Sequence, residues 1–343
     1  MNTQREIYSQ PQVWTQTLTE FSKAQINTPP ANNGLDQYLV TGCGSTYYIS
    51  IWAANIIQSK LGVFSQPLPA SELMMFPGSW IISDHSIQLL AISRSGTTSE
   101  TIAAVKQIKE NGKINTSVVT CYPESELALL ADTLIATPAA QEKSIAQTRS
   151  FTNMMLGISY LLEGEVKDGL PGKLAESGTA LIKNYSGLMK RIANDKQIDR
   201  FFFLGSNQNY GLACEAMLKM KEMSLSYSEA YHFLEFRHGP MSMVNNQSLV
   251  VGLLRKDNLQ HELRVLKDMK ELGGKILAIG GEIEDDIPGW IDYYVPIGLS
   301  QAGSFGDVLY LPPLQILSFE KALAKGLDPD NPQNLSAVVI LDL

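Results

Sequence analysis

Apolar and polar residues alternate along the chain in two ways, as short apolar runs and as longer segments with helical spacing. In the first half of the chain, short runs with the length and composition of buried strands lie at 37–41, 87–92 and 116–120. Helices are expected between these strands, at 47–60 and 99–110. Strands that are apolar on both faces and alternate with helices are typical of a parallel sheet covered by helices.

The same order of elements returns about 160 positions later. Strands are expected at 200–205, 249–254 and 273–279, with helices from Gly211 and at 259–272. Such regular spacing indicates duplication of an α/β unit. We therefore predict an α/β fold with two similar three-layer αβα domains, each built on a parallel sheet in the flavodoxin-like manner.

The N-terminal segment precedes the first of these domains. Its apolar residues recur at roughly helical spacing: Ile7, Trp14, Leu18 and Phe21. Pro29-Pro30 is expected to end this helical arm. The predicted division is an N-terminal arm at 1–30, a first domain at 31–171, and a second domain with the C-terminal tail at 172–343. A helical region at about 172–195 is expected to link the two domains.

Composition narrows the classes of function. The chain has 343 residues, of which 44% are apolar and 18% charged, and its formal net charge is −8. No run of Lys or Arg stands out, so the sequence disfavours nucleic acid or an anionic membrane as a partner. The N-terminus has no signal-peptide core, and no uninterrupted apolar run approaches about 18 residues. These features predict a cytoplasmic protein.

Cysteine and histidine usage argues against disulfides and metal sites. Cys43, Cys121 and Cys214 lie far apart without CxxC spacing, and the chain has only four histidines. The sequence therefore predicts no disulfide framework, no metal site and no cofactor.

The loop 93–98 concentrates groups that can bind an anion. It supplies four hydroxyl groups and the Arg94 guanidinium directly before an expected helix, whose first N–H groups are free. Ser45 and Thr46 follow another strand in the same way. The loop has neither the GxxxxGK pattern of a P-loop nor a complete dinucleotide fingerprint. We predict a binding site for a phosphate monoester, and the alternative is a helix that is merely well capped.

Residues 214–240 carry the second concentration of ionisable groups. If the chain is helical from Cys214 to about Tyr227, then Glu215, Lys219 and Glu222 share one face of a mostly apolar helix. A carboxylate in such a setting suits a general base. His238 lies beside a Gly-Pro break and could carry protons near neutral pH. The alternative is a structural Glu–Lys pair of the kind that is common on helices.

These segments occur in the order of a known family. The chain resembles the sugar isomerase (SIS) family of phosphosugar-binding proteins, in particular the isomerase half of glucosamine-6-phosphate synthases. The resemblance extends over nearly the whole chain. The matching segments are Glu6-Ile7, Gln10-Pro11, 42–47, 93–98, 148–152, 218–222, 229–231, His238-Gly239-Pro240 and Asn334-Leu335.

The resemblance implies a role for each of these residues. Six residues of the hydroxyl loops would hold the sugar phosphate: Ser45, Thr46, Ser93, Arg94, Ser95 and Thr98. Glu222 would be the base that moves a proton between C1 and C2 of the sugar, with Lys219 in the catalytic set and Glu215 in contact with substrate. His238 would assist ring opening. It would come from the neighbouring subunit of a homodimer with a shared active site.

Three departures from the synthases alter the expected reaction. The synthases carry an N-terminal glutaminase domain, for which this chain is expected to have no room, so glutamine-driven synthesis is not expected. Arg94 replaces a glutamine of the phosphate loop and can grip an oxyanion with two N–H groups. The synthase motif Asn-Leu-Ala-Lys is here Asn334-Leu335-Ser336-Ala337. Because Ala337 can neither form an imine nor donate a proton, the reaction would proceed without that lysine or would use Lys219 or Lys221.

The sequence therefore predicts a phosphosugar aldose–ketose isomerase or deaminase. The preferred activity is glucosamine-6-phosphate deamination to fructose 6-phosphate and ammonia without glutamine. The alternatives are an isomerase or deaminase for galactosamine, tagatose or fructosamine phosphates, and a non-catalytic phosphosugar sensor.

Overall fold

The structure is a computed structural model that describes residues 1–23, 34–82, 84–110, 114–281, 287–298, 300–336, 338 and 341. The chain divides into two compact units. The first unit comprises Ser9–Lys143 and Gln147–Lys173, with the described residues from Ser336 on. The second unit comprises Met1–Tyr8, Ser144–Ala146 and Leu174–Leu335.

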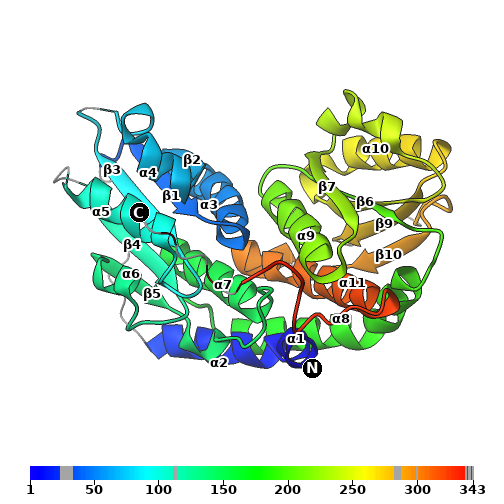
Figure 1. The fold of residues 1–343 in the computed structure, drawn as a ribbon, viewed down its shortest axis with the longest axis horizontal. Coiled ribbons are helices and arrows are strands. Elements are labelled where there is room, and N and C mark those ends of the chain that lie inside the picture. Colours follow the sequence, from blue (N-terminus) through cyan, green and yellow to red (C-terminus); the bar gives the residue numbers. More distant parts are fainter. Residues whose placement is uncertain are drawn as a thin grey trace. The chain divides into compact units, whose positions relative to one another are not determined.

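The first unit is built on a parallel sheet in the order β2-β1-β3-β4-β5, visible in Figure 1. Its strands are β1 (Gln37–Gly42), β2 (Phe64–Pro69), β3 (Ile87–Ile92), β4 (Asn115–Thr120) and β5 (Thr133–Ala136). Its helices are α2 (Gln10–Lys23), α3 (Ser45–Leu61), α4 (Ala70–Met75), α5 (Ser99–Glu110), α6 (Glu126–Leu129) and α7 (Arg149–Glu163), with short 3-10 turns η1 (Pro77–Ser79) and η2 (Pro138–Ala140). Helices α2, α3 and α7 pack together, whereas α4, α5 and α6 enclose an apolar core around Leu89 and Val118.

The second unit repeats this plan in the order β7-β6-β8-β9-β10. Its strands are β6 (Arg200–Gly205), β7 (Tyr227–His232), β8 (Ser248–Leu254), β9 (Lys275–Gly280) and β10 (Tyr293–Pro296). Its helical elements are α1 (Asn2–Tyr8), α9 (Asn209–Ser224), η3 (Glu235–Arg237), η4 (Pro240–Met243), η5 (Lys256–Asn258), α10 (Leu259–Glu271), η6 (Ser300–Tyr310) and α11 (Leu311–Ala324). Helix α8 (Leu170–Ala193) begins in the first unit and continues into the second. Helix α9 packs on β6, β7 and α11, and α10 packs on β8 and β9 (Figure 1).

The predicted fold class is confirmed. Both sheets are parallel, both have five strands, and the chain visits the strands in the same order in each unit, as duplication of one α/β unit requires. The linking helix predicted near 172–195 is α8. The predicted ends of the first domain near residues 30 and 171 stay a prediction. In the structure α1 packs on α11 in the second unit, whereas α2 belongs to the first unit.

Two kinds of local prediction need correction. Helix α9 does not extend to Tyr227: it ends at Ser224, Leu225 adopts a left-handed φ of 49°, and Tyr227 begins a strand. The edge strands β2, β5, β7 and β10 were not predicted. Their burial is mixed, because an edge strand is not enclosed on all sides, so they lack the continuous apolar run of a central strand. The expected end of the arm at Pro29-Pro30 lies outside the described residues, and so do Asn111 and Gly112, which follow the helix expected at 99–110.

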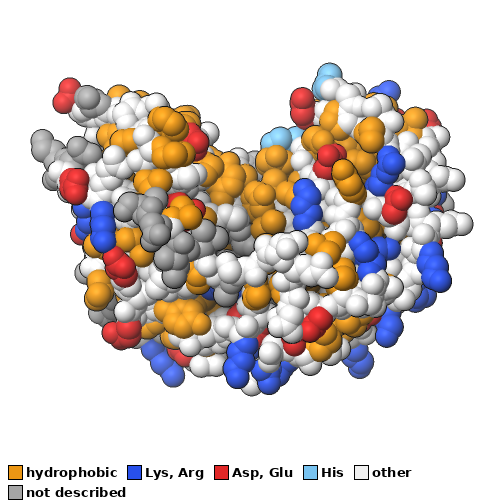
Figure 2. All heavy atoms as spheres, viewed as in Figure 1, with side chains coloured by type: hydrophobic (Ala, Val, Ile, Leu, Met, Phe, Trp, Pro, Cys, Tyr) orange, Lys and Arg blue, Asp and Glu red, His pale blue; other side chains and the backbone are white. Residues whose placement is uncertain are grey.

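The surface charge, the hydropathy of the helices and the placement of possible metal ligands can be compared with the predicted partners. On the face shown in Figure 2, the Lys and Arg side chains of the described residues are interspersed with those of Asp and Glu. Among the described helices, none combines the length and hydropathy needed to cross a membrane. The same part of the chain contains no group of three or more His, Cys, Asp or Glu residues that could hold a metal ion.

Candidate functional site

The predicted phosphate-binding residues of the first unit lie at the carboxyl ends of two neighbouring strands of its sheet. Strands β1 and β3 are neighbours, and from them the chain continues to β2 on one side and to β4 on the other. Such a switch point leaves a crevice at the carboxyl ends of the strands, where ligands of this fold class bind. Ser45 and Thr46 follow β1, and the loop 93–98 follows β3. The structure therefore brings both hydroxyl-bearing turns to neighbouring strand ends.

Hydrogen bonds hold the loop 93–98 in one shape. The Ser93 hydroxyl accepts from the Gly96 N–H at 3.1 Å, and its Oγ lies 3.0 Å from Thr98 Oγ1. The Ser95 hydroxyl accepts from the Thr97 N–H at 3.2 Å. The Arg94 carbonyl accepts from the Cys121 N–H at 3.1 Å, which fixes the loop to the end of β4. A ligand would meet donors that are already positioned before it binds.

The Thr46 hydroxyl is used within its own turn. It accepts from the Cys43 N–H at 2.9 Å and donates to the Cys43 carbonyl at 2.9 Å. A hydroxyl group has a single hydrogen to donate. Thr46 therefore shapes the turn, and it could donate to a phosphate only by giving up its bond to Cys43. Ser45 is nearly buried at the first position of α3.

Gly96 is required by the loop for two reasons. Its φ is +65°, and a Cβ atom there would lie 1.9 Å from Ser125 Oγ. We expect Gly96→Ala to lower the free energy of unfolding by about 3 kcal/mol, because backbone strain and overpacking both act. Gly62→Ala is the matched control, since Gly62 has a φ of +66° but no atom within 4 Å of the added Cβ. It should lose about 1 kcal/mol in urea denaturation. Equal losses in the two variants would contradict the crowding argument.

Sequence reasoning missed Glu142, which lies beside Arg94. The Glu142 side chain has no exposed surface, and its carboxylate lies 3.7 Å from Arg94 Nη1. It accepts from the Thr148 N–H at 2.9 Å, from the Thr148 hydroxyl at 2.6 Å and from the Ser150 hydroxyl. A buried carboxylate with these partners balances the charge of the nearly buried Arg94 guanidinium. Glu142 belongs to no helix or strand, so periodicity carried no signal for it.

We expect Glu142→Gln to lower the free energy of unfolding by about 3 kcal/mol, because the Arg94 cation would lose its buried partner. Urea denaturation monitored by circular dichroism measures this. The control is Glu126→Gln, whose carboxylate pairs with Lys106 at 2.7 Å on the surface. That variant should change stability by less than about 1 kcal/mol. A Glu142→Gln protein as stable as the control would show that the Arg94 pair contributes nothing.

In the second unit, α9 brings three predicted site residues together. The Lys219 ammonium lies 3.3 Å from Glu215 Oε1 and donates a hydrogen bond to Glu222 Oε2. Helical spacing of three and four residues produces this arrangement. Lys219 and Glu215 are 1% and 0% exposed at their side chains, whereas Glu222 is 19% exposed. Glu222 is thus the member of the cluster that a ligand can reach.

The cluster keeps its lysine charged. Burial opposes the charged form of Lys219, but the carboxylates of Glu215 and Glu222 together outweigh it and raise the pKa of Lys219 above its ordinary value of 10.5. An amine that stays protonated cannot attack a carbonyl. Lys219 therefore acts as a fixed cation beside Glu222. Lys221 points elsewhere, since its side chain is exposed and its ammonium contacts Met217 Sδ at 3.1 Å.

His238 follows η3, which comes after β7, a strand that packs on α9. It is exposed at the end of η3, where its N–H donates to the Glu235 carbonyl at 2.9 Å. Within the described part of the second unit, it forms no hydrogen bond or ion pair with Glu222. Ala337, which stands where the synthases have a lysine, lies outside the described residues.

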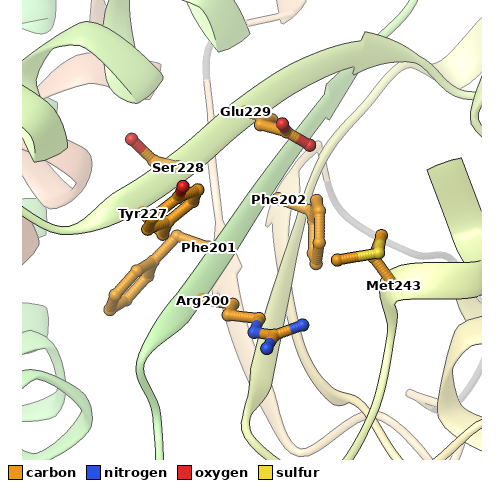
Figure 3. A pocket seen from close by; sticks show the side chains of 7 residues that line it. All are labelled: Arg200, Phe201, Phe202, Tyr227, Ser228, Glu229 and Met243. Carbon is orange, nitrogen blue, oxygen red and sulfur yellow. The ribbon is translucent and has the colours of Figure 1, made fainter.

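One cavity of the second unit lies apart from the predicted site residues. It has a volume of about 340 Å³ and is lined by Arg200, Phe201, Phe202, Tyr227, Ser228, Glu229 and Met243. Figure 3 shows Met243 pointing toward the Phe202 ring, with Glu229 and Arg200 at opposite ends. Its walls are mainly apolar, and the Glu229 carboxylate accepts from the Tyr231 hydroxyl at 3.0 Å. Neither Glu222 nor Lys219 lines it.

Comparison with known proteins identifies relatives of this chain. The family model for the SIS domain matches residues 36–163 and 196–289. A relative from Caldanaerobacter subterraneus subsp. tengcongensis, named glutamine–fructose-6-phosphate aminotransferase (isomerizing), is 28% identical, and the match covers 90% of this chain and 52% of the relative. A relative of the same name from Pyrobaculum aerophilum is 29% identical, and the match covers 98% of this chain and 57% of the relative. The chain thus spans about half the length of the curated relatives it matches.

Solved structures share the whole architecture. A glucosamine-6-phosphate deaminase from Thermotoga maritima superposes with a TM-score of 0.80 and 26% identity, covering 99% of this chain and 100% of that one. A tagatose-6-phosphate ketose/aldose isomerase from Escherichia coli superposes with a TM-score of 0.87 and 23% identity, covering 98% and 96%. Since the SIS profile matches more than half of the sequence, at segments that contain strands of both sheets, the chain belongs to the SIS domain family.

Proposed function

We propose that the chain is a phosphosugar aldose–ketose isomerase or deaminase, most specifically a glucosamine-6-phosphate deaminase. The observation that carries this proposal is the cluster on α9, where a fixed cation holds the partly exposed carboxylate of Glu222. A positioned carboxylate is what abstraction of a proton beside a sugar carbonyl requires. The similarity to the deaminase from Thermotoga maritima, which extends over both chains, supports the choice of substrate.

The proposed reaction begins with opening of the sugar ring. Glu222 removes the proton from C2 of the open-chain aldehyde and returns it to C1. O1 gains a proton and the C2 amine loses one, so that the aldehyde becomes an alcohol and the amine becomes an imine. Water adds to C2, the C–N bond breaks, and fructose 6-phosphate and ammonia are released. One water is consumed for each ammonia. The Lys219 ammonium holds the Glu222 carboxylate in place by a hydrogen bond, and the Glu215 carboxylate balances the charge of Lys219.

The phosphate group of the substrate is assigned to the first unit. Ser93, Ser95 and Thr98 would donate hydroxyl hydrogen bonds, with Arg94 and Ser45 beside them. This assignment is supported by the position of the loop at the β1/β3 switch point and before α5. Thr46 is proposed to hold the turn rather than the ligand.

Incubation of the purified protein with glucosamine 6-phosphate tests the activity. Fructose 6-phosphate and ammonia should appear in equal amounts, without added glutamine. The absence of both products at millimolar substrate would reject the deaminase proposal.

Two other functions remain as alternatives. An isomerase or deaminase for a galactosamine, tagatose or fructosamine phosphate would use the same acid–base groups, and a substrate panel followed by NMR separates these substrates. A phosphosugar sensor would bind without turnover. If the wild type turns over no member of the panel and Glu222→Gln leaves ligand affinity intact, sensing becomes the better explanation.

The exposed position of His238 supports a homodimer in which this residue completes the site of a partner. We expect Glu222→Gln and His238→Ala proteins each to be inactive alone. Mixing them after reversible dissociation should restore up to about a quarter of the activity, because some mixed dimers carry one intact site. Mixtures as inactive as either parent would contradict the shared site.

A further inference from the structure

A second cavity of the second unit has chemistry that the proposed reaction does not use. Its volume is about 460 Å³. It lies at the amino ends of β6 and β7, between the end of α8, the link from α9 to β7, and the end of α11. Its lining residues are Ala193, Asn194, Asp195, Lys196, Ile198, Asp199, Leu225, Ser226, Tyr227, Lys321, Ala324 and Lys325.

Among the described residues, two of the three lysines that line this cavity, Lys321 and Lys325, donate hydrogen bonds only to uncharged acceptors. The Lys321 ammonium donates to the Ile198 carbonyl at 2.8 Å, although the residue is only 7% exposed. The Lys325 ammonium donates to the Leu225 carbonyl at 2.9 Å and to Ser226 Oγ at 3.3 Å. Within the part of the chain that the structure describes, neither lysine forms an ion pair. Among the described residues, Lys321 is therefore a nearly buried cation without the neutralising partner that such cations normally have, and Lys325 is an exposed cation near it.

The electrostatic surroundings of the two lysines also favour the binding of an anion in this cavity. Burial and then the nearby Lys325 ammonium lower the pKa of Lys321, and burial also lowers the pKa of Lys325. The carboxylates of Asp195 and Asp199 act on Lys321 more weakly. Each already has a cation of its own, because Asp195 pairs with Lys275 and Asp199 lies 3.7 Å from Arg200 Nε. An anion between the lysines would relieve the unfavourable burial and repulsion.

Donor capacity remains for such an anion. An ammonium group has three N–H donors, of which Lys321 uses one and Lys325 two in the bonds above. The remaining donors could bind the oxygens of a phosphate, which a compact ammonium suits as a point charge.

The rest of the cavity suits hydroxyl groups. The Asn194 amide can donate and accept, and the Asp199 carboxylate can accept from a hydroxyl. Tyr227 is 82% exposed, so its ring is available to the apolar face of a ligand. The volume falls in the range typical of small-molecule sites.

We propose that this cavity is a second ligand site, which binds a small organic phosphate carrying hydroxyl groups. Lys321 and Lys325 bind the phosphate, and Asn194 and Asp199 bind the hydroxyl groups. The site is separate in its lining from Glu222 and from the loop 93–98, so it does not depend on the proposed reaction.

Lysine footprinting by reductive methylation and peptide mass spectrometry tests this assignment residue by residue. Glucose 6-phosphate is the probe, with glucose and inorganic phosphate as comparisons. At about ten times its dissociation constant, glucose 6-phosphate should slow the labelling of Lys321 and Lys325 by about tenfold. Lys183, which is exposed on α8 outside the cavity, should label at an unchanged rate. Equal protection by inorganic phosphate would overturn the role given to the hydroxyl groups.

Stoichiometry provides an independent test on the folded protein. Equilibrium dialysis with glucose 6-phosphate should find one site fewer in each Lys321→Met chain than in the wild type, whatever the proposed active site binds. The control Lys183→Met should bind as many ligands as the wild type. Thermal unfolding checks that both variants are folded. A Lys321→Met protein that binds as many ligands as the wild type, or unchanged labelling of Lys321 at saturating ligand, would overturn the proposal.

Discussion

Replacement of Glu222 with Gln is expected to reduce turnover of the amino-sugar phosphate by about 10²–10⁴-fold, the range that general acid–base catalysis supplies. Gln keeps the size of the side chain and can still accept a hydrogen bond from Lys219, but it cannot take a proton from C2. Affinity for substrate should therefore change by no more than about threefold, so that kcat falls and KM is nearly preserved.

The proton transfer itself can be followed in deuterated water. Wild-type protein should introduce deuterium at C1 of the product, and Glu222→Gln should do so at the same reduced rate as turnover. Lys221→Gln is the control. Lys221 is on the same helix, but its side chain is exposed and its ammonium contacts the Met217 sulfur rather than the cluster around Lys219. If Glu222→Gln retains more than about a tenth of the wild-type kcat, another group is the base.

Replacement of Lys219 with Met is expected to lower the free energy of unfolding by about 4 kcal/mol at neutral pH. Met fills most of the space, but it leaves the buried Glu215 carboxylate and the Glu222 carboxylate without the cation between them. Lys221→Met is the matched control. It removes a lysine from the exposed side of the same helix and should change stability by less than about 0.5 kcal/mol.

The pH dependence distinguishes lost charge pairing from lost packing. The pKa of Lys219 is raised above 10.5, so its contribution to stability is fully present below that pH and is lost only as the pH rises through the higher folded value. The wild-type contribution is therefore constant from about pH 5 to about pH 9. In the variant, two carboxylates repel each other and protonation relieves the repulsion. The loss should be larger at about pH 8 than at about pH 4.5, and an equal loss at both would indicate a packing defect.

The central strands were predictable because a strand that is covered on both faces consists mainly of apolar residues. Strands β1, β3 and β8 are buried at every position, and apart from Gln37 and Gln88 they consist of apolar or small residues. The edge strand β2 contains two prolines and has exposed and half-buried positions. Proline is tolerated at a sheet edge, where the missing N–H is not needed. From sequence alone such a segment is indistinguishable from a loop.

The three charged residues of α9 were predictable as neighbours, because helical spacing alone places Glu215 and Glu222 on the face of Lys219. The burial of these three residues was not predictable from the sequence. Burial and the two carboxylates together determine the protonation state of Lys219. Glu142 is the converse case. Its partner Arg94 lies 48 positions earlier in the chain, so only the folded loop reveals the contact.

The sequence by itself determined the duplicated α/β plan, the helix that carries Glu222, and the hydroxyl-rich loop before α5. These are local features, which the spacing of apolar residues and the residues around each turn indicate directly. The tertiary structure alone decided that the loops after β1 and β3 meet at a switch point, that Glu142 balances Arg94, and that Lys321 and Lys325 converge in one cavity. These contacts join segments far apart in the chain. The charges of these side chains affect stability and binding strongly only where folding removes water from around them.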